Sequence, residues 1–100
     1  MSIETTATVK RRVSSSMTTI YTGTPVQIDD ASYDEVGYAP DGQSPADAFM
    51  IYVMWPGYTI QRGDELTDEL NGGNPYNVLS KPAPYPDGHV EVKTYQVVGT

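Results

Sequence analysis

Turn-forming residues recur so often in this chain that no stretch between them keeps a helical apolar period for more than a turn or two. Glycine supplies backbone conformations that other residues resist, and proline lacks an N–H group, so both end regular structure. Strand-length segments between closely spaced turns are typical of all-β domains. We therefore predict an all-β fold, a single small β-barrel or sandwich of about six short strands with one long acidic loop. The interruptions fall at residues 14–16, Gly23, Pro25, Pro56, Gly57, residues 71–75 and residues 81–88.

The alternation of side chains places the expected strands. Residues 5–13 put Ala7, Val9 and Val13 on one face, although Arg11 interrupts that face. The apolar run 48–55 (AFMIYVMW) has the length of a strand and is predicted to be the central core strand. The remaining strands are expected at 17–28, as two strands or as one strand bent or bulged at Gly23 and Pro25, and at 65–70, 76–79 and 89–98. We expect no helix, and no regular structure in the proline-rich residues 81–88.

The length of 100 residues indicates one domain spanning 1–100. The chain has no cysteine, which excludes disulfides and thiolate metal sites. The first residues lack the order of a signal peptide, and no apolar run approaches the ~20 residues that cross a bilayer, so we expect a soluble product with no membrane partner.

The charge balance is strongly acidic, with 13 Asp and Glu against 6 Lys and Arg, a net charge of -7 and a pI of about 4.3. Such a chain gains little from counterion release on a phosphate backbone, so nucleic-acid binding is not expected to be its main activity. An acidic surface can instead prevent DNA from adhering where it must slide past.

Residues 29–47 (DDASYDEVGYAPDGQSPAD) contain acidic residues and no basic one, and we interpret them as a long loop. Two alternatives remain open for this loop: a solvated insertion, or a segment that orders on assembly. This loop has three side chains with which to dock against another surface, those of Tyr33, Val36 and Tyr38. As a candidate functional loop it contributes Asp29, Asp30, Tyr33, Asp34, Glu35, Tyr38, Asp41 and Asp47.

In contrast to the acidic loop, the sequence has a basic cluster formed by Lys10, Arg11 and Arg12. Charges on one strand most often mark a solvated or edge-protecting face. If the cluster is functional, its natural partners are the acidic loops of neighbouring copies, which makes these residues candidates for contacts between subunits.

Catalytic chemistry finds little support, and we predict that the chain is not an enzyme, with no catalytic residues, metal or cofactor. His89 is the single histidine, and it is expected at the surface because no Gly-x-Ser-x-Gly elbow accompanies it. Neighbouring acids at 64–65 and 68–69 point to opposite faces of a strand and are interpreted as solubilising charges. The acidic loop lacks the spacing of a calcium loop, and Gly72-Gly73 lacks the ending of a phosphate loop.

Three segments together resemble the head-tail joining (head-completion or stopper) proteins of tailed bacteriophages. TIYTGTPVQID (19–29) is similar to their strand with a Tyr/Thr-Gly-x-Pro/Ala step. FMIYVMWPGYTIQRGDEL (49–66) resembles their apolar strand, Pro-Gly-type turn and Gly-Asp step. GGNPYNVLSKPAPYPDGHVEVKTYQVV (72–98) is similar to their Gly-x-x-Tyr-x-Val strand, variable loop and final strand.

The resemblance implies a structural subunit of the phage neck, made in the host cytoplasm and located in the virion. Identical subunits would form a homo-oligomeric ring below the portal and its adaptor, with tail proteins underneath. A loop of each subunit would reach toward the channel to retain packaged DNA, which is a partner only by proximity. The loop at 29–47 matches that position, and its residues are the candidate channel-facing ones.

Two other classes compete with this interpretation. A small-barrel adaptor or peptide-binding module would use aromatic residues as a recognition groove. A capsid decoration or tail-terminator subunit would be a phage structural protein at a different site. The groove residues would be Tyr21, Trp55, Tyr58, Tyr76 and Tyr85, beside KPAPYP.

Overall fold

The computed structural model of the chain describes residues 4–39, 46–54 and 60–97, and these form seven strands and one short helix. Strands account for nearly all of the regular structure, which confirms the all-β prediction. Within the described ranges, no helix has the length and apolar character that a membrane crossing requires. The elements are β1 (Thr5–Val13), β2 (Ser16–Ala31), α1 (Tyr33–Val36), β3 (Ala46–Val53), β4 (Glu65–Asp68), β5 (Tyr76–Val78), β6 (Ala83–Pro84) and β7 (Val90–Val97).

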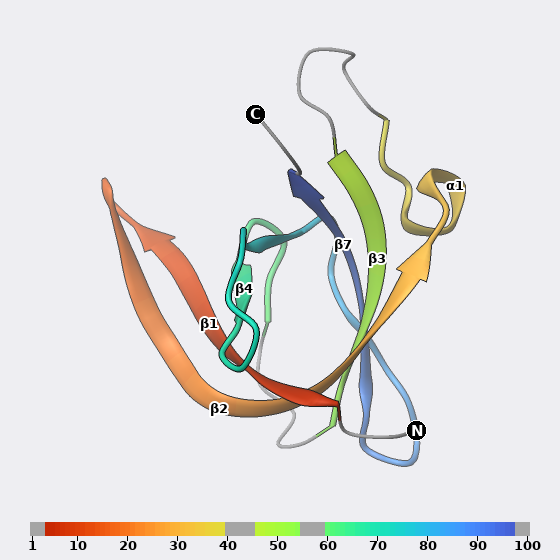
Figure 1. Cartoon of the computed structure of the whole chain (residues 1–100), viewed down its shortest axis with the longest axis horizontal. Helices are drawn as coiled ribbons and strands as arrows, with labels where there is room; N and C mark the ends of the chain where they lie inside the picture. The colour runs from red at the N-terminus through yellow and green to blue at the C-terminus, as the bar shows by residue number, and fades with distance from the viewer. Residues whose placement is uncertain (1–3, 40–45, 55–59, 98–100) are drawn as a thin grey trace.

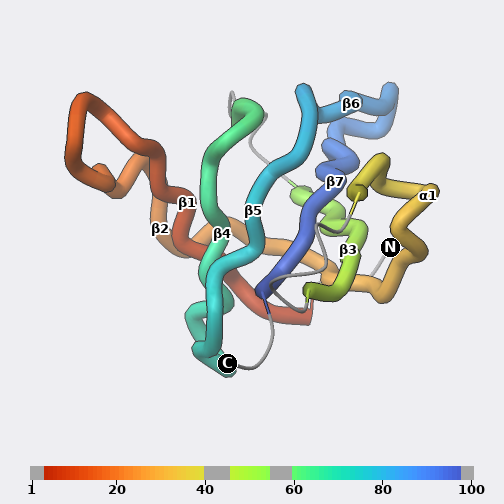
Figure 2. The backbone as a smooth tube through the Cα atoms, turned by 90° about the horizontal axis from the view of Figure 1, so that it is seen from above, coloured from red at the N-terminus to blue at the C-terminus, as the bar shows by residue number. Residues whose placement is uncertain are grey.

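The strands form one antiparallel sheet in the order β3-β2-β1-β4-β5-β7-β6, and an additional pairing of β3 with β7 joins its ends. Six strands therefore follow one another around a ring-like sheet, and their order can be followed by the labels in Figure 2. The two-residue strand β6 pairs with β7 beside β5. The expectation of no regular structure at 81–88 was wrong at this point, because Pro84 lies at the edge of the sheet, where its missing N–H costs no ladder bond.

β1 and β2 form a long hairpin whose second strand is sharply bent (Figure 1). Between Ala7 and Val9 the paired residues on β2 run from Thr24 to Tyr21, so β2 carries an extra residue there. Gly23 adopts a φ of 68° at this bulge, a conformation that favours glycine. The predicted bend at Gly23 is confirmed, and the bend carries β2 from its pairing with β1 to its pairing with β3.

The apolar run in β3 is explained by burial on both of its faces. Ile51 and Val53 point into the main core inside the ring of strands. Ala48 and Met50 point outward, into a second cluster beneath α1. A strand covered on both sides shows a nearly continuous apolar sequence rather than an alternating one. The predicted central strand is confirmed, with bounds shifted to Ala46–Val53.

Every strand of the ring contributes buried side chains to the main core. Val9, Leu66 and Val92 are each at most 1% exposed. The core residues are Ala7, Val9, Val26, Ile51, Val53, Ile60, Leu66, Val78, Val90 and Val92.

Candidate functional site

The acidic segment is more structured than the sequence suggested. Asp29 and Asp30 belong to the end of β2, and Asp47 belongs to the start of β3, so the predicted loop boundaries at 29 and 47 were too wide. Tyr33, Asp34 and Glu35 lie in α1, a helix that was not predicted. Tyr38 follows the helix, and Asp41 lies outside the described residues.

A capping box begins helix α1. The Ser32 hydroxyl accepts a hydrogen bond from the Glu35 backbone N–H at 3.1 Å, and the Glu35 carboxylate accepts one from the Ser32 N–H at 2.9 Å. Gly37 ends the helix in the left-handed conformation at φ 72°. The Ser32 backbone and side-chain hydrogen bonds lower the pKa of Glu35. Ser-x-x-Glu followed by glycine was the signal available in the sequence for this helix.

Aromatic contacts hold the segment against the outer face of the sheet. Tyr38 stacks on Tyr95 of β7 with ring centroids 4.6 Å apart, and Tyr33 meets Tyr38 edge-on at 5.6 Å. The Tyr33 hydroxyl donates to the Ala46 carbonyl at 2.8 Å. Val36 is buried in the second cluster. The described part of the segment therefore packs against the sheet within a single copy. The residues that make these contacts include Tyr33, Val36 and Tyr38, for which docking was expected.

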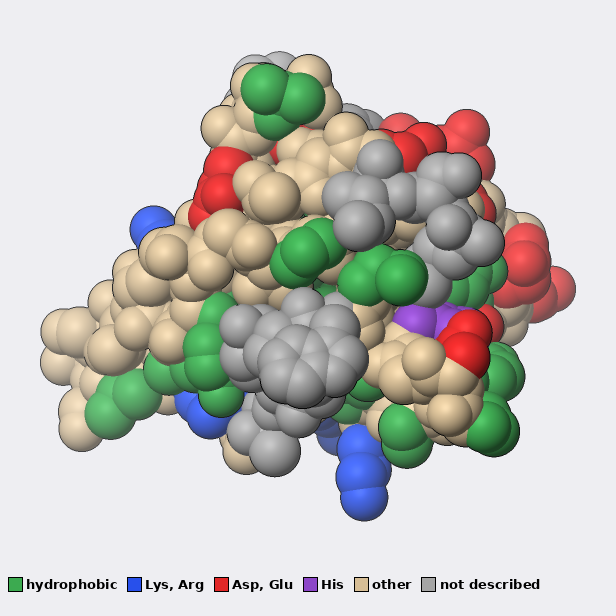
Figure 3. Space-filling view, turned by 90° about the horizontal axis from the view of Figure 1, so that it is seen from below, with side chains coloured by type: hydrophobic (Ala, Val, Ile, Leu, Met, Phe, Trp, Pro, Cys, Tyr) green, Lys and Arg blue, Asp and Glu red, His purple; other side chains and the backbone are tan. Residues whose placement is uncertain are grey.

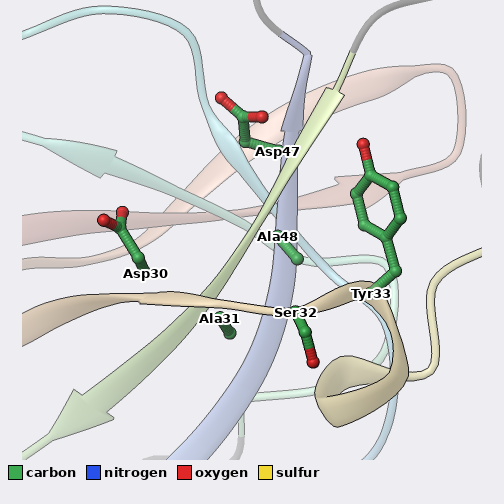
Figure 4. Close-up of a pocket in the computed structure, with 6 residues that line it drawn as sticks. All are labelled: Asp30, Ala31, Ser32, Tyr33, Asp47 and Ala48. Carbon is green, nitrogen blue, oxygen red and sulfur yellow. The ribbon is translucent and has the colours of Figure 1, made fainter.

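An open cleft of about 510 Å³ lies where β2 ends and β3 begins. We call it the acidic cleft, because two of its lining side chains are the exposed carboxylates of Asp30 and Asp47. Figure 4 shows both carboxylates and the Tyr33 ring projecting to the same side of the strands. Within the described ranges no set of three or more His, Cys, Asp or Glu is arranged to hold a metal. The lining residues are Asp30, Ala31, Ser32, Tyr33, Asp47 and Ala48.

The three residues of the basic cluster have different environments. Arg11 lies on the inner face of β1 and forms a two-pronged ion pair with Asp64, with Nε–Oδ1 and Nη2–Oδ2 distances of 2.9 Å. This hydrogen-bonded contact raises the pKa of Arg11. Lys10 and Arg12 lie on the opposite, outer face, and in the described part of the chain neither takes part in an ion pair.

Arg11 and Asp64 explain two features of the sequence. Arg11 interrupts an apolar face because its guanidinium reaches a carboxylate that is 1% exposed. Asp64 also accepts a hydrogen bond from the Gln61 N–H at 2.9 Å, within the turn at Gly63. The interpretation of Asp64 as a solubilising charge was wrong. Its neighbour Glu65 is paired with Lys10 on the outer face, as strand alternation required.

The tip of the β1–β2 hairpin projects beyond the rest of the sheet, and we call residues 11–19 the arm (Figures 1 and 2). Pairing of β1 with β4 ends at Lys10, and pairing of β2 with β3 begins only at Val26. In the arm, β1 and β2 therefore pair with each other and with no third described strand. Val13 is 52% exposed, and Ser14 at the turn has a φ of 59°, which favours glycine.

Hydrogen bonds fix the base of the arm on both faces of the sheet. On the outer face, the Glu69 carboxylate accepts bonds from the Thr6 and Thr8 hydroxyls at 2.7 and 2.6 Å, and from the Gly23 N–H at 2.8 Å. The Gly23 bond, followed by those from Thr8 and Thr6, lowers the pKa of Glu69. On the inner face, Arg11 is bonded to Asp64. The arm is thus held in a defined direction at the bulge.

Asp68 is the second acidic residue that the sequence interpretation placed wrongly, since it is 6% exposed. Its carboxylate accepts hydrogen bonds from the Thr5 hydroxyl at 2.7 Å and from the Asn71 side chain at 2.8 Å. The Leu70 and Asn71 backbone N–H groups add two more. Burial by itself raises the pKa of Asp68, but these four bonds outweigh it, and the net result is a lowered pKa.

Acid should therefore weaken the fold through Asp68. A lowered native pKa means that this carboxylate stabilises the native state fully above its ordinary pKa of 3.8, and that the contribution disappears as the pH falls through the native value. We expect the stability difference between wild type and Asp68→Asn to be largest near pH 7 and to shrink below about pH 4. Urea unfolding at a series of pH values measures it. Thr67→Ala, a neighbouring change without a carboxylate, should give a constant difference, and a constant difference for Asp68→Asn would contradict the assignment.

His89 is half-buried between aromatic rings rather than freely solvated. Its ring stacks on Tyr85 at 4.6 Å and meets Tyr52 edge-on at 6.0 Å, and its Nδ1 contacts the Asp87 carboxylate. Figure 3 shows the imidazole at the surface beside an acidic side chain. Asp87 also accepts a bond from the His89 N–H, so this pair closes the turn before β7.

The aromatic residues proposed for a peptide groove are not gathered by the described structure. Tyr21 and Tyr76 pack against the main core, and Tyr76 meets Phe49 edge-on at 5.2 Å. Tyr85 lies instead on the outer face beside His89. Trp55 and Tyr58 lie outside the described residues.

Comparison with known proteins supports the fold alone. No family model matches the chain, and no curated protein matches it either. The structure is similar to the solution structure of protein SF1141 from Shigella flexneri 2a, with a TM-score of 0.60 and 14% sequence identity. The match covers 98% of this chain and 96% of that chain, so the likeness extends over the whole fold.

Proposed function

We propose that this chain is a non-enzymatic structural subunit of the neck of a tailed bacteriophage. Identical copies would form a ring below the portal and adaptor, close the DNA channel and join the tail. The observation that supports this proposal best is the arm, which projects with open strand edges from a sheet whose other main strands are paired on both sides.

Open strand edges favour an assembly role because their unpaired N–H and C=O groups are templates for further pairing. The closed ring pairs each of its six strands with a neighbour on both sides, and outside the arm the two-residue strand β6 lies at the edge of the sheet. In the arm, residues 11–13 and 16–19 have a described partner strand on one side only. An edge of this kind suits a subunit that is covered by its neighbours.

The distribution of charge is compatible with a channel for DNA. Asp34 and Glu35 are exposed on α1, at one end of the molecule. Repetition of these carboxylates around a ring would create a negative constriction. Such a surface disfavours adhesion of a polyanion, so that retention of DNA would be steric and no bond would be made or broken. The resemblance of three segments to head-completion proteins points to the same position in the virion.

The oligomeric state tests the proposal. Light scattering on the purified chain, at several concentrations and with or without a candidate portal–adaptor assembly, should detect a ring that joins the adaptor. A monomer that ignores the adaptor and binds a proline-rich peptide would instead favour a recognition module. A ring that attaches to capsid or tail and not to the adaptor would indicate a decoration or tail-terminator subunit.

A further inference from the structure

The arm and the acidic cleft lie at opposite ends of the molecule. In Figures 1 and 2 the hairpin tip and α1 are on opposite sides of the sheet, and the two views agree. In Figure 3 most acidic side chains on the visible face also lie away from the projecting hairpin. An arm therefore cannot reach the cleft of its own chain, whereas it can reach the cleft of another copy.

The two surfaces are complementary in charge. Lys10 and Arg12 lie on one face of the arm and its base, and Arg12 is exposed. Asp30 and Asp47 project together from the cleft (Figure 4). The chain as a whole carries a net charge of -7, so two copies repel one another unless opposite charges meet locally. Arg12 in the arm and Lys10 at its base take part in no ion pair described here, so both are available to attract an acidic surface.

The apolar parts of the two surfaces also correspond. Val13 at the tip of the arm is 52% exposed, and Tyr33 at the cleft is 41% exposed. The arm extends by roughly 10 Å beyond the last β4 pairing, at about 3.3 Å for each strand residue, so its tip stands clear of the ring and can reach a surface of another copy. Its base is fixed by Arg11–Asp64 and by Glu69, and a fixed projection loses little conformational freedom on docking.

We infer that the arm of each copy docks in the acidic cleft of the next copy, with Lys10 and Arg12 facing Asp30 and Asp47, and Val13 against the cleft wall. This inference rests on the proposed function, because it names the contact by which the ring forms. A contact between two different surfaces repeats head to tail and closes into a ring when the rotation permits. The occupant of the cleft is thus a second copy of this chain.

Charge reversal tests the contact. The arm variant Lys10→Glu/Arg12→Glu and the cleft variant Asp30→Lys/Asp47→Lys should each weaken self-association by about tenfold or more at low salt. An equal mixture of the two variants should restore self-association. The negative arm of the first variant then meets the positive cleft of the second, and the positive arm of the second meets the negative cleft of the first. Arg62→Glu, an exposed basic residue outside the arm, is the matched control and should leave self-association unchanged. Circular dichroism establishes that every variant is folded.

Salt gives a second readout with a definite sign. Screening weakens an arm–cleft contact between opposite charges, whereas it strengthens association that is limited only by the net repulsion of acidic chains. We expect wild-type self-association to fall as salt rises. Failure of the mixture to restore association would overturn the inference.

Cysteine cross-linking locates the contact, since the chain has no native cysteine. A mixture of Arg12→Cys and Asp47→Cys should give disulfide-linked dimers, and a mixture of Arg12→Cys with Lys81→Cys should not. Rings on the adaptor that tolerate both reversals would overturn the arm–cleft contact and leave the proposed function standing. If the mixture restores association but the chain does not bind the adaptor, the arm–cleft contact stands and the proposed function is overturned. A wild-type chain that stays monomeric under all conditions would overturn both.

Discussion

Asp64→Ala is expected to lower the free energy of unfolding by about 3 kcal/mol, because removal of one member of a buried ion pair leaves its partner uncompensated. The Asp64 carboxylate is 1% exposed and accepts bonds from Arg11 and from the Gln61 N–H. The Arg11 side chain is 25% exposed, so water recovers part of its solvation, and we place the effect at the low end of the usual range. Urea unfolding at pH 7 measures it.

Two further variants separate the ion pair from the turn. Arg11→Ala should cost at least as much as Asp64→Ala, since it leaves a carboxylate that is 1% exposed without its ion pair, although the bond from the Gln61 N–H remains. The double variant should cost clearly less than the sum, with a coupling free energy of about 1 kcal/mol or more. Glu65→Ala, the adjacent residue on the other face, is the control and should change stability by about 0.5 kcal/mol or less. Strictly additive effects of Arg11→Ala and Asp64→Ala would contradict the structural role assigned to the pair.

Ile51→Ala is expected to destabilise the whole fold by about 3 to 4 kcal/mol, the usual cost of a large-to-small change in a tightly packed core. Ile51 is completely buried in β3, and its paired neighbours are Ile28 of β2 and Val92 of β7. The cavity would form where the pairing of β3 with β7 closes the ring. Global unfolding by urea should shift to lower concentration with an unchanged slope.

Val36→Ala provides the contrast, because Val36 is buried in the second cluster under α1 and not in the main core. We expect a loss of about 1 to 2 kcal/mol for two removed methyl groups. Hydrogen exchange should increase in residues 33–38 while the strands of the ring keep their protection. If Val36→Ala instead accelerates exchange in all strands, the two clusters form one cooperative unit and α1 is part of the core.

The elements that the sequence predicted well are those set by local patterns. The bounds of β1 agree with the alternation in residues 5–13, and the bend at Gly23 agrees with a glycine in a strand. Side chains alternate across any strand, so period-2 apolar positions reveal an inner face without knowledge of the partner strand. The turn at Gly63 is also a local feature, because a positive φ is a demand on one residue.

The acidic segment shows where local reasoning failed. Four helical residues are too few to display an apolar period, so α1 was missed although Ser32 and Glu35 form a capping box. Acidic composition suggested a loop starting at Asp29, yet β2 continues through Asp30 because β3 pairs with it there. Pairing with a strand twenty residues away overrode the local preference of aspartate, which is normally depleted in strands.

The sequence alone determined that the chain is all-β, strongly acidic and divided by frequent turns, because these properties belong to single residues and their near neighbours. The tertiary structure decided which charges are buried and which are available. Arg11 and Arg12 are adjacent, but one is bonded to Asp64, 53 positions away, and the other is exposed on the arm. Ion pairs, ring closure and the separation of the arm from the acidic cleft depend on contacts between distant segments, and only the folded chain brings those segments together.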